Sequence, residues 1–221
     1  MSGIVIIGAG QAGSSMAVKL RSLGFQGDVT LIGEEPVAPY QRPPLSKKYL
    51  LGEMSLERLY LRPPEFYATQ NINLRLGTKV TAVDTINKSV KLGDETLHYS
   101  HLALATGSKP RLLPTSIGGA LDGVFTVRTL ADVDAMQTAF EQGGHVLVIG
   151  GGYIGLEAAA VAAKKGLKVT LVEMADRILQ RVASSETSDY FRDLHTGHGV
   201  KILEGVGLDH LTGDDKVIGA V

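Results

Sequence analysis

The sequence predicts an α/β fold, and three observations lead to this prediction. One pattern occurs twice: a short aliphatic run leads through closely spaced glycines into a helix-forming run, and a second aliphatic run follows. The stretch between the copies alternates apolar and polar residues with a period of two, as half-buried strands do. Glycine is also frequent, with 27 of 221 residues. This excess indicates turns that need backbone without side chains.

The first copy begins with the aliphatic residues 4–7, which predict a buried strand. Gly8, Gly10 and Gly13 follow, and residues 14–20 favour a helix. The second aliphatic run, residues 29–32, predicts a parallel neighbour for the first strand, and Glu34 follows it closely. The copy therefore predicts a βαβ unit with an acidic residue at the tip of its second strand.

The second copy has the same order. An aliphatic run at residues 146–149 precedes glycines, residues 156–160 favour a helix, and a second aliphatic run ends at Glu173. Its spaced glycines are Gly150, Gly152 and Gly155. Glu34 lies 21 residues after Gly13, and Glu173 lies 18 residues after Gly155. Both intervals agree with the roughly 20 residues typical of a dinucleotide-binding unit.

The glycine spacing has a physical reason. In such a motif the first glycine permits the tight turn from strand to helix, the second lets a pyrophosphate approach the backbone, and the third lets the helix pack closely on the strand. Amide groups at the helix start bind the phosphates, and the tip carboxylate accepts hydrogen bonds from ribose hydroxyls. The chain therefore predicts two Rossmann-like units with parallel sheets. Two dinucleotide sites in one chain suggest a flavin and a nicotinamide.

The remaining stretches fill the space around these units. Residues 79–84, 89–92 and 97–99 predict an antiparallel meander, and a buried strand is expected near residues 102–105. Pro110 and Pro114 mark a linker, and a helix is expected over residues 130–141. We place a domain boundary between residues 111 and 112.

Composition excludes several classes of protein. The chain has no cysteine, so these residues form no disulfide framework, zinc–thiolate site, cysteine-ligated cluster or redox dithiol. The formal net charge is −1, which gives no argument for nucleic acid as a partner. The longest apolar stretch contains glycines and Glu157, so we expect no membrane span and a cytoplasmic protein. No metal site is expected either: the six histidines are interpreted as structural or surface residues, with His195 and His198 expected in a loop.

Four stretches carry a resemblance to a known family: residues 39–47, which include Pro-Pro-Leu-Ser-Lys, residues 105–107, residues 127–130 and residues 150–157. On these the chain resembles the FAD-dependent reductases of ferredoxin-dependent oxygenase systems. The resemblance implies an NADH-oxidising flavoprotein that reduces a ferredoxin or rubredoxin-like iron–sulfur carrier. It assigns residues 1–111 to the FAD-binding domain and residues 112–221 to the NAD-binding domain.

The resemblance also implies roles for individual residues. Contacts to FAD are expected from Ala12, Glu34, Lys47, Val80 and Arg128, with Arg42 near the flavin. Contacts to NAD are expected from Ile154, Glu157, Glu173 and Arg181. The cofactor-binding set is completed by the motif residues Gly8, Gly10, Gly13, Ala105, Thr106, Gly107, Gly150, Gly152, Tyr153 and Gly155. No protein acid or base is required for hydride transfer between cofactors, so no catalytic residue is predicted. Lys47 and Glu157 are candidate modulators of that transfer.

Several of these residues also have an ordinary structural explanation. Solvated surface positions are the ordinary explanation for Lys47, Arg42 and Arg181, and a surface turn before a helix is the one for Arg128. Glu157 stands in the first turns of its predicted helix, where the helix dipole alone favours an acid. Glu173 favours NAD over NADP, because a carboxylate repels a 2′-phosphate.

Members of the family are much longer, with a second flavin-binding stretch and an interface domain that cannot be found here. The final run, residues 216–221, is typical of the first arm of a hairpin, so we expect a C-terminally truncated chain. The sequence leaves oligomeric state and acceptor open. Alternatives with the same fold are reduction of a quinone, a radical or dioxygen, or an NADH-sensing redox-signalling flavoprotein with little turnover.

Overall fold

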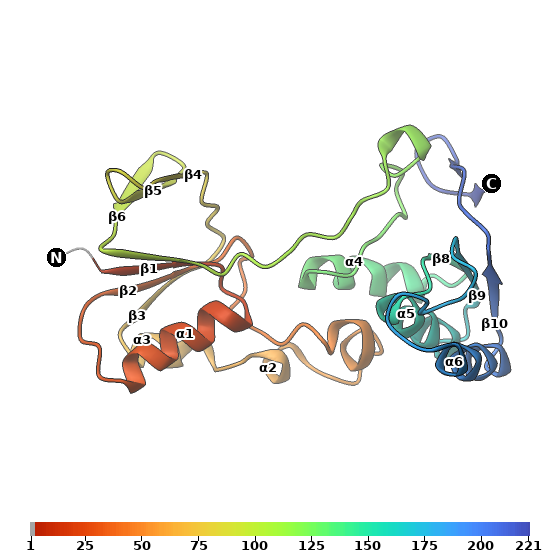
Figure 1. Ribbon diagram of the computed structural model, residues 1–221, viewed down its shortest axis with the longest axis horizontal. Coiled ribbons are helices and arrows are strands. Elements are labelled where there is room, and N and C mark those ends of the chain that lie inside the picture. The colour runs from red at the N-terminus through yellow and green to blue at the C-terminus, as the bar shows by residue number, and fades with distance from the viewer. Residues whose placement is uncertain (1–2) are drawn as a thin grey trace. The chain divides into compact units, whose positions relative to one another are not determined.

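The computed structural model describes residues 3–221, which form two compact units (Figure 1). The first unit holds the chain up to Arg42 together with Ser55–Lys109, and the second holds Pro43–Met54 and Pro110–Val221. The division after Lys109 lies close to the expected boundary between residues 111 and 112. The inclusion of Pro43–Met54 in the second unit was not expected, because its sequence neighbours on both sides belong to the first. The assignment of the domains to FAD and NAD stays a prediction.

The first unit is built on a parallel sheet in the order β3-β2-β1-β7. The central strands are aliphatic except for Thr30, and all their residues are buried, which fits a parallel sheet covered on both faces. Helix α1 packs on one face, where Ala17 joins the buried cluster around Ile6 and Leu31. The bounds are β1(Ile4–Ile7), α1(Gln11–Ser22), β2(Val29–Ile32), α2(Leu56–Leu59), α3(Pro64–Thr69), β3(Ile72–Arg75) and β7(His101–Leu104).

The predicted meander is confirmed as a separate antiparallel sheet, β4(Ala82–Asp84), β5(Ser89–Leu92) and β6(Glu95–His98). Val90 and Leu92 of β5 pack with Val5, Ile7 and Ile32 into a second cluster of the first unit. The strand near residues 102–105 is less buried than expected. Leu104 of β7 is 68 % exposed, because β7 is the last strand of its sheet among the described residues.

The second unit holds a parallel sheet in the order β10-β9-β8. Its elements are α4(Leu130–Glu141), β8(His145–Ile149), α5(Tyr153–Lys164), β9(Lys168–Glu173), α6(Ser185–Gly197) and β10(Val200–Glu204). The prediction of α4 is confirmed, and its start is fixed by a capping box of Thr129 and Asp132. The short helices η1(Leu45–Tyr49), a π-helix, and η2(Thr115–Ile117) also belong to this unit.

Two expectations were wrong. The final run is not a first hairpin arm, because β12(Gly219–Ala220) pairs antiparallel with β11(Leu211–Thr212) as a second arm. His195 does not lie in a loop: it is a buried residue of α6, and its ring nitrogens contact the carbonyl oxygens of Phe191 and Leu156. These two backbone contacts hold the side chain of His195 inside the unit, and α6 continues to Gly197.

Within residues 3–221, no helix combines the length and the apolar character that crossing a membrane requires.

Candidate nucleotide-binding sites

The glycine turn of the first unit has the geometry that its sequence predicts. Gly8 follows β1 with a φ of 113°, a region that favours glycine. A Cβ on Gly13 would overlap the carbonyl oxygen of Gly8, so α1 starts as close to the strand as the backbone allows. A Cβ on Gly10, in contrast, would meet no protein atom within 4 Å. The fold accounts for the first and third glycines and leaves the second unexplained.

The glycine turn of the second unit repeats this arrangement. Gly150 follows β8 with a φ of 104°, and a Cβ on Gly155 would overlap the carbonyl oxygen of Gly150. A Cβ on Gly152 would again meet no protein atom within 4 Å. In both units the second glycine therefore leaves open backbone at the position where a pyrophosphate approaches in a dinucleotide-binding turn.

The helices after these turns also start alike. The N-cap residues of α1 and α5 are Gly10 and Gly152, and neither start has a side-chain capping hydrogen bond. The other long helices of the second unit are capped, α4 by Thr129 and α6 by Ser184. A helix N-terminus without a side-chain cap presents backbone amides and the positive end of the helix dipole, which suits a phosphate.

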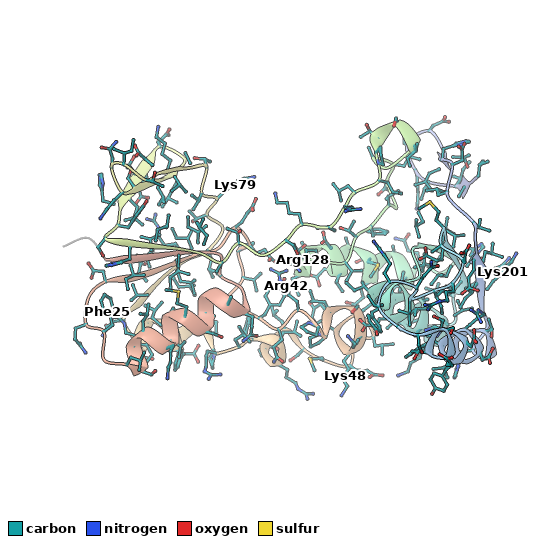
Figure 2. All side chains as sticks on the ribbon, viewed as in Figure 1. Phe25, Arg42, Lys48, Lys79, Arg128 and Lys201 are labelled. Atoms are coloured by element: carbon teal, nitrogen blue, oxygen red, sulfur yellow. The ribbon has the colours of Figure 1, made fainter. Side chains whose placement is uncertain are left out.

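The acidic residues at the two strand tips are held differently. Glu34 lies beyond the end of β2 and is paired at 3.2 Å with Lys79, which Figure 2 labels. Both side chains are about 60 % exposed. Glu173 ends β9 and accepts hydrogen bonds from the backbone amides of Gly151, at 2.7 Å, and Ala175, at 2.8 Å. The carboxylate of Glu173 is thus fixed beside the glycine turn.

The loop after β9 packs against this turn. A Cβ on Gly151 would come within 2.5 Å of the side chain of Ile178, which is fully buried. The amide of Ile178 donates to Glu204 at 2.8 Å, and the same carboxylate holds Arg192 through two nitrogens at 2.8 and 3.1 Å. These side-chain hydrogen bonds raise the pKa of Arg192, which keeps its positive charge.

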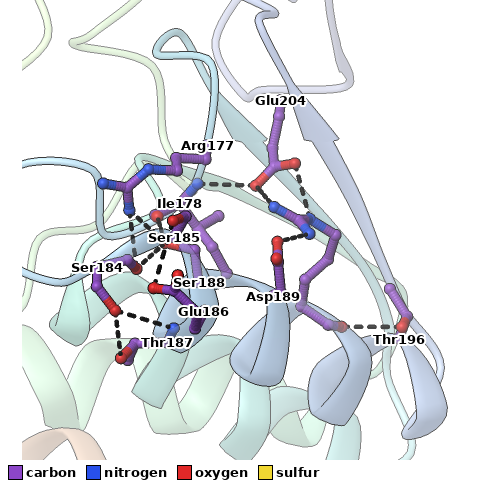
Figure 3. Close-up of polar contacts among 11 residues, drawn as sticks. Arg177, Ile178, Ser184, Ser185, Glu186, Thr187, Ser188, Asp189, Thr196 and Glu204 are labelled. Carbon is purple, nitrogen blue, oxygen red and sulfur yellow. Dashed lines mark hydrogen bonds and ion pairs between the residues drawn. The ribbon is translucent and has the colours of Figure 1, made fainter.

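Two further residues complete the loop. The Arg177 guanidinium donates to the carbonyl oxygens of Ala183 and Ser184 and to the hydroxyl of Ser188 at 2.6 Å (Figure 3). Leu179 has a φ of 56°, rare for a side chain of its size, and its amide donates to the carbonyl oxygen of Gly151 at 2.9 Å. Arg181 follows Leu179 on the exposed part of the loop. A fixed loop thus carries the arginine that was predicted to contact NAD.

Lys47 and Glu157 are brought together within the second unit. The Lys47 ammonium lies 2.7 Å from Oε1 of Glu157, which stands on α5 five residues beyond Gly152. The hydroxyl of Ser46 donates to Oε2 of the same carboxylate at 2.5 Å. The sequence singled out Lys47 and Glu157 as candidate modulators, and that role stays a prediction. It did not predict their ion pair or the hydrogen bond from Ser46, because no local pattern links positions so far apart in the chain.

The remaining predicted residues are distributed between the units. Ala12 and Val80 lie in the first unit with Ala105, Thr106 and Gly107, which follow β7, and the backbone of Ala105 faces Gly8. Arg42 pairs there with Glu35 at 2.5 Å. Arg128 belongs to the second unit and directly precedes Thr129, the N-cap of α4. Tyr153 and Ile154, in the first turn of α5, are more than half exposed.

Within the described residues, no cluster of three or more histidine, aspartate or glutamate side chains could hold a metal.

A family model described as pyridine nucleotide-disulphide oxidoreductase matches residues 2–221. The chain belongs to this family. The relationship agrees with the two glycine turns, each between a parallel strand and an uncapped helix. It also confirms the predicted α/β fold with Rossmann-like units, since the structural neighbours of the chain are reductases of this type.

Among curated relatives, this chain is 46 % identical to rhodocoxin reductase of Rhodococcus erythropolis over 213 residues. These residues are 96 % of this chain and 50 % of the relative. It is 42 % identical to putidaredoxin reductase of Pseudomonas putida, over 97 % of this chain and 52 % of the relative. The chain thus spans about half the length of the curated relatives it matches.

Among solved structures, the chain superimposes on the reductase in the covalent putidaredoxin reductase–putidaredoxin complex with a TM-score of 0.94 and 40 % identity. That match covers all of this chain and 54 % of the other. A ferredoxin reductase from Rhodopseudomonas palustris gives a TM-score of 0.93 and 38 % identity, covering all of this chain and 55 % of that one.

Proposed function

We propose that this chain is the FAD- and NADH-binding part of a reductase that passes electrons from NADH to a ferredoxin-type iron–sulfur carrier. The observation that carries the proposal is the repeated open glycine. Gly10 and Gly152 each start a helix without a side-chain cap, and an added Cβ would meet no protein atom at either position. A structural demand does not explain two such glycines, whereas two dinucleotide phosphate groups do.

In this proposal the first unit binds FAD. Its pyrophosphate would lie at the start of α1, near Ala12, and Glu34 would accept hydrogen bonds from the adenosine ribose. Lys79 holds Glu34 through an exposed ion pair, which is weak enough to yield to ribose hydroxyls. The other predicted contacts to FAD in the first unit are Val80, Ala105, Thr106, Gly107 and Arg42. Lys47 and Arg128 are also predicted contacts to FAD, and they belong to the second unit. When bound, the flavin supplies acceptance of hydride and release of single electrons.

The second unit would bind NADH at the start of α5. Glu173 is fixed by two backbone amides, so it meets the adenosine ribose in one orientation and opposes a 2′-phosphate. Tyr153 and Ile154 offer exposed apolar surface in the first helical turn, and Arg181 lies on the fixed loop. The residues of the chain therefore bind and orient the nucleotide, while the chemistry belongs to the cofactors.

The electron acceptor is proposed from the relatives. One is named a putidaredoxin reductase and another, from Pseudomonas putida, a rubredoxin–NAD(+) reductase. We extend to this chain a ferredoxin or rubredoxin-like partner and direct transfer to it, because these 221 residues hold no cysteine for a dithiol relay. The proposal keeps the cytoplasmic location expected from the sequence.

An anaerobic NADH titration of the purified protein, followed by visible absorbance, tests the proposal. We expect flavin bands that bleach with NADH at concentrations far below those needed with NADPH. Loss of the preference for NADH would remove the role given to Glu173. A protein that binds no FAD, and that stays free of flavin after reconstitution, would refute the flavin part of the proposal.

The acceptor needs a separate experiment. Reduction of cytochrome c by NADH should become fast only when a ferredoxin is added, because the carrier then delivers single electrons. Equal rates with quinone or dioxygen alone would favour another acceptor. A stable NADH complex with a change of oligomeric state and little turnover would favour a redox sensor.

A further inference from the structure

Residues 43–54, here called the strap, leave the first unit and return to it, yet they pack within the second. The strap's helix η1 lies against α5 and α4. Leu45 and Leu50 are fully buried, and Tyr49 donates to Asp134 of α4 at 2.7 Å. The strap is therefore held by the helices of the second unit, and Lys47 is placed by those helices.

Two consecutive strap residues bind one carboxylate. Ser46 donates to Oε2 of Glu157 at 2.5 Å, and Lys47 lies 2.7 Å from Oε1. Ser46 is only 5 % exposed, so its hydroxyl is directed inward to Glu157. A hydrogen bond from a hydroxyl to an ionised carboxylate is stronger than one between neutral groups, and a buried one competes little with water.

The ion pair between Lys47 and Glu157 is partly exposed to solvent. The side chain of Lys47 is 47 % exposed and that of Glu157 is 29 % exposed, and an ion pair in such a setting contributes little by itself. The Lys47 ammonium also donates to the carbonyl oxygen of Pro43 at 3.1 Å, within the same strap. The buried hydroxyl of Ser46 is therefore the better candidate for fixing the orientation of Glu157.

We infer that Ser46 is a positioning residue, which holds the carboxylate of Glu157 in the orientation that fixes the ammonium of Lys47. The proposed function gives this contact its purpose, because Lys47 is the cation expected near the flavin. The contact itself does not depend on that function, so an experiment can refute the positioning role of Ser46 and the proposed function independently of each other.

The first test measures the accessibility of Lys47 in the 221-residue protein. An amine-acylating reagent is applied, and mass spectrometry gives the labelling rate of Lys47 relative to Lys48, the exposed neighbour (Figure 2). Ser46→Ala should raise this ratio about threefold, because the released carboxylate holds the ammonium for less of the time. Glu157→Gln removes the charge of the pair directly and should raise the ratio at least as much.

Two control variants separate positioning from a general loosening of the strap. Ser46→Thr keeps the hydroxyl and should return the ratio to the wild-type value. Glu53→Gln breaks the exposed pair of the strap with Lys164 and should leave the ratio unchanged. An unchanged ratio in Ser46→Ala, or equal ratios in the Ala and Thr variants, would overturn the inference.

The second test uses the flavin-loaded protein and rapid mixing with NADH. Ser46→Ala should slow bleaching of the flavin about tenfold at saturating NADH, with little change in the NADH concentration that gives half the maximal rate. A changed labelling ratio with an unchanged bleaching rate would overturn the role of Ser46 in the reaction. If NADH fails to bleach the wild-type flavin, the proposed function fails, and the labelling ratio still decides whether Ser46 positions Lys47.

Discussion

In the first unit β1 lies between β2 and β7, whereas in the second β8 pairs only with β9 among residues 3–221. The burial of the two strands differs accordingly: all four residues of β1 are buried, while both ends of β8 are exposed. Yet the turns that follow agree in the positive φ of the first glycine, the open second glycine, the close third glycine and the uncapped helix. The shared features of the two turns are those that a nucleotide phosphate requires. The difference between the units lies in how the strand before each turn is packed.

The first glycine shows the packing difference most strongly. A Cβ on Gly8 would overlap the carbonyl oxygen of Ala105, which follows the neighbouring strand β7, whereas a Cβ on Gly150 would meet nothing within 4 Å. Both have positive φ. We expect Gly8→Ala to lower the free energy of unfolding by about 3–5 kcal/mol, from backbone strain and overpacking together, and Gly150→Ala by about 1–2 kcal/mol from strain alone.

Urea denaturation of the two variants measures this difference. Because each variant changes the same residue type at the same motif position, the difference isolates the contribution of β7. Equal losses of stability would show that the strand beside β1 does not constrain the turn, and would break the comparison.

The second glycine should separate binding from stability. An added Cβ has room at Gly10 and Gly152, so we expect either alanine variant to change the free energy of unfolding by less than about 1 kcal/mol. Each methyl group would occupy the approach of a phosphate. Gly10→Ala should weaken FAD binding at least tenfold, and Gly152→Ala should weaken NADH binding at least tenfold.

Fluorescence titration with FAD, and NADH titration of the flavin-loaded protein, give the two affinities. The variants serve as controls for each other, since Gly10→Ala should spare NADH binding in whatever protein retains flavin. Wild-type affinities in both variants would mean that these glycines do not mark the phosphate sites.

These parts of the molecule also show how far the sequence could predict the structure. The βαβ units and α4 are encoded in local patterns, such as the spacing of three glycines or the capping box from Thr129 to Asp132. The contact of Ser46 and Lys47 with Glu157 joins residues more than 100 positions apart, and no local periodicity reports it. The place of the strap in the second unit is set by burial of Leu45 and Leu50, which a pattern of apolar residues cannot assign to one unit or the other.

The strap, residues 43–54, also shows a limit of reasoning by resemblance. Its motif predicts that Lys47 contacts the cofactor, and because the motif is contiguous in sequence with residues of the first unit, the resemblance places it in that domain. The predicted FAD contacts are in fact divided, with Ala12, Glu34 and Val80 in the first unit and Lys47 and Arg128 in the second. Which residues act on which cofactor stays a prediction.

The acidic strand tips allow a test of coenzyme choice. Glu173→Gln replaces one of the two carboxylate oxygens by an NH₂ group, which cannot accept a hydrogen bond, so the bond from either Gly151 or Ala175 is lost. The substitution also removes the negative charge that opposes a 2′-phosphate. We expect KM for NADH to rise about fivefold and the preference for NADH over NADPH to fall about tenfold. Glu34→Gln, in the exposed pair with Lys79, should leave this preference unchanged.

Steady-state kinetics with both nucleotides give the preference as the ratio of kcat/KM values. A fall in the ratio with Glu34→Gln would mean that the nicotinamide nucleotide binds the first unit. That result would exchange the assignments of the two units.

The smallest expected effects come from two exposed ion pairs, one in each unit, in which the pKa of the carboxyl group is lowered. In the first unit the two hydrogen bonds from Arg75, at 2.7 and 2.6 Å, lower the pKa of Glu95. In the second, the hydrogen bond from Lys164 lowers the pKa of Glu53. A carboxyl whose pKa is lower in the folded chain than in the unfolded chain stabilises the fold above the unfolded value, near 4.5, and this contribution is lost as pH falls through the folded value.

Thermal denaturation of Glu95→Gln and Glu53→Gln at pH 7 and at pH 3 measures both contributions. Each variant should melt slightly below wild type at pH 7 and should approach wild type at pH 3, because the wild-type carboxyl becomes protonated there. The difference at pH 7 should be larger for Glu95→Gln, since a bidentate arginine pair is stronger than a single contact from an exposed lysine. Arg75 also joins β3 of the parallel sheet to β6 of the meander, so a difference that persists at pH 3 would show that Glu95 holds these sheets together by packing, not by charge.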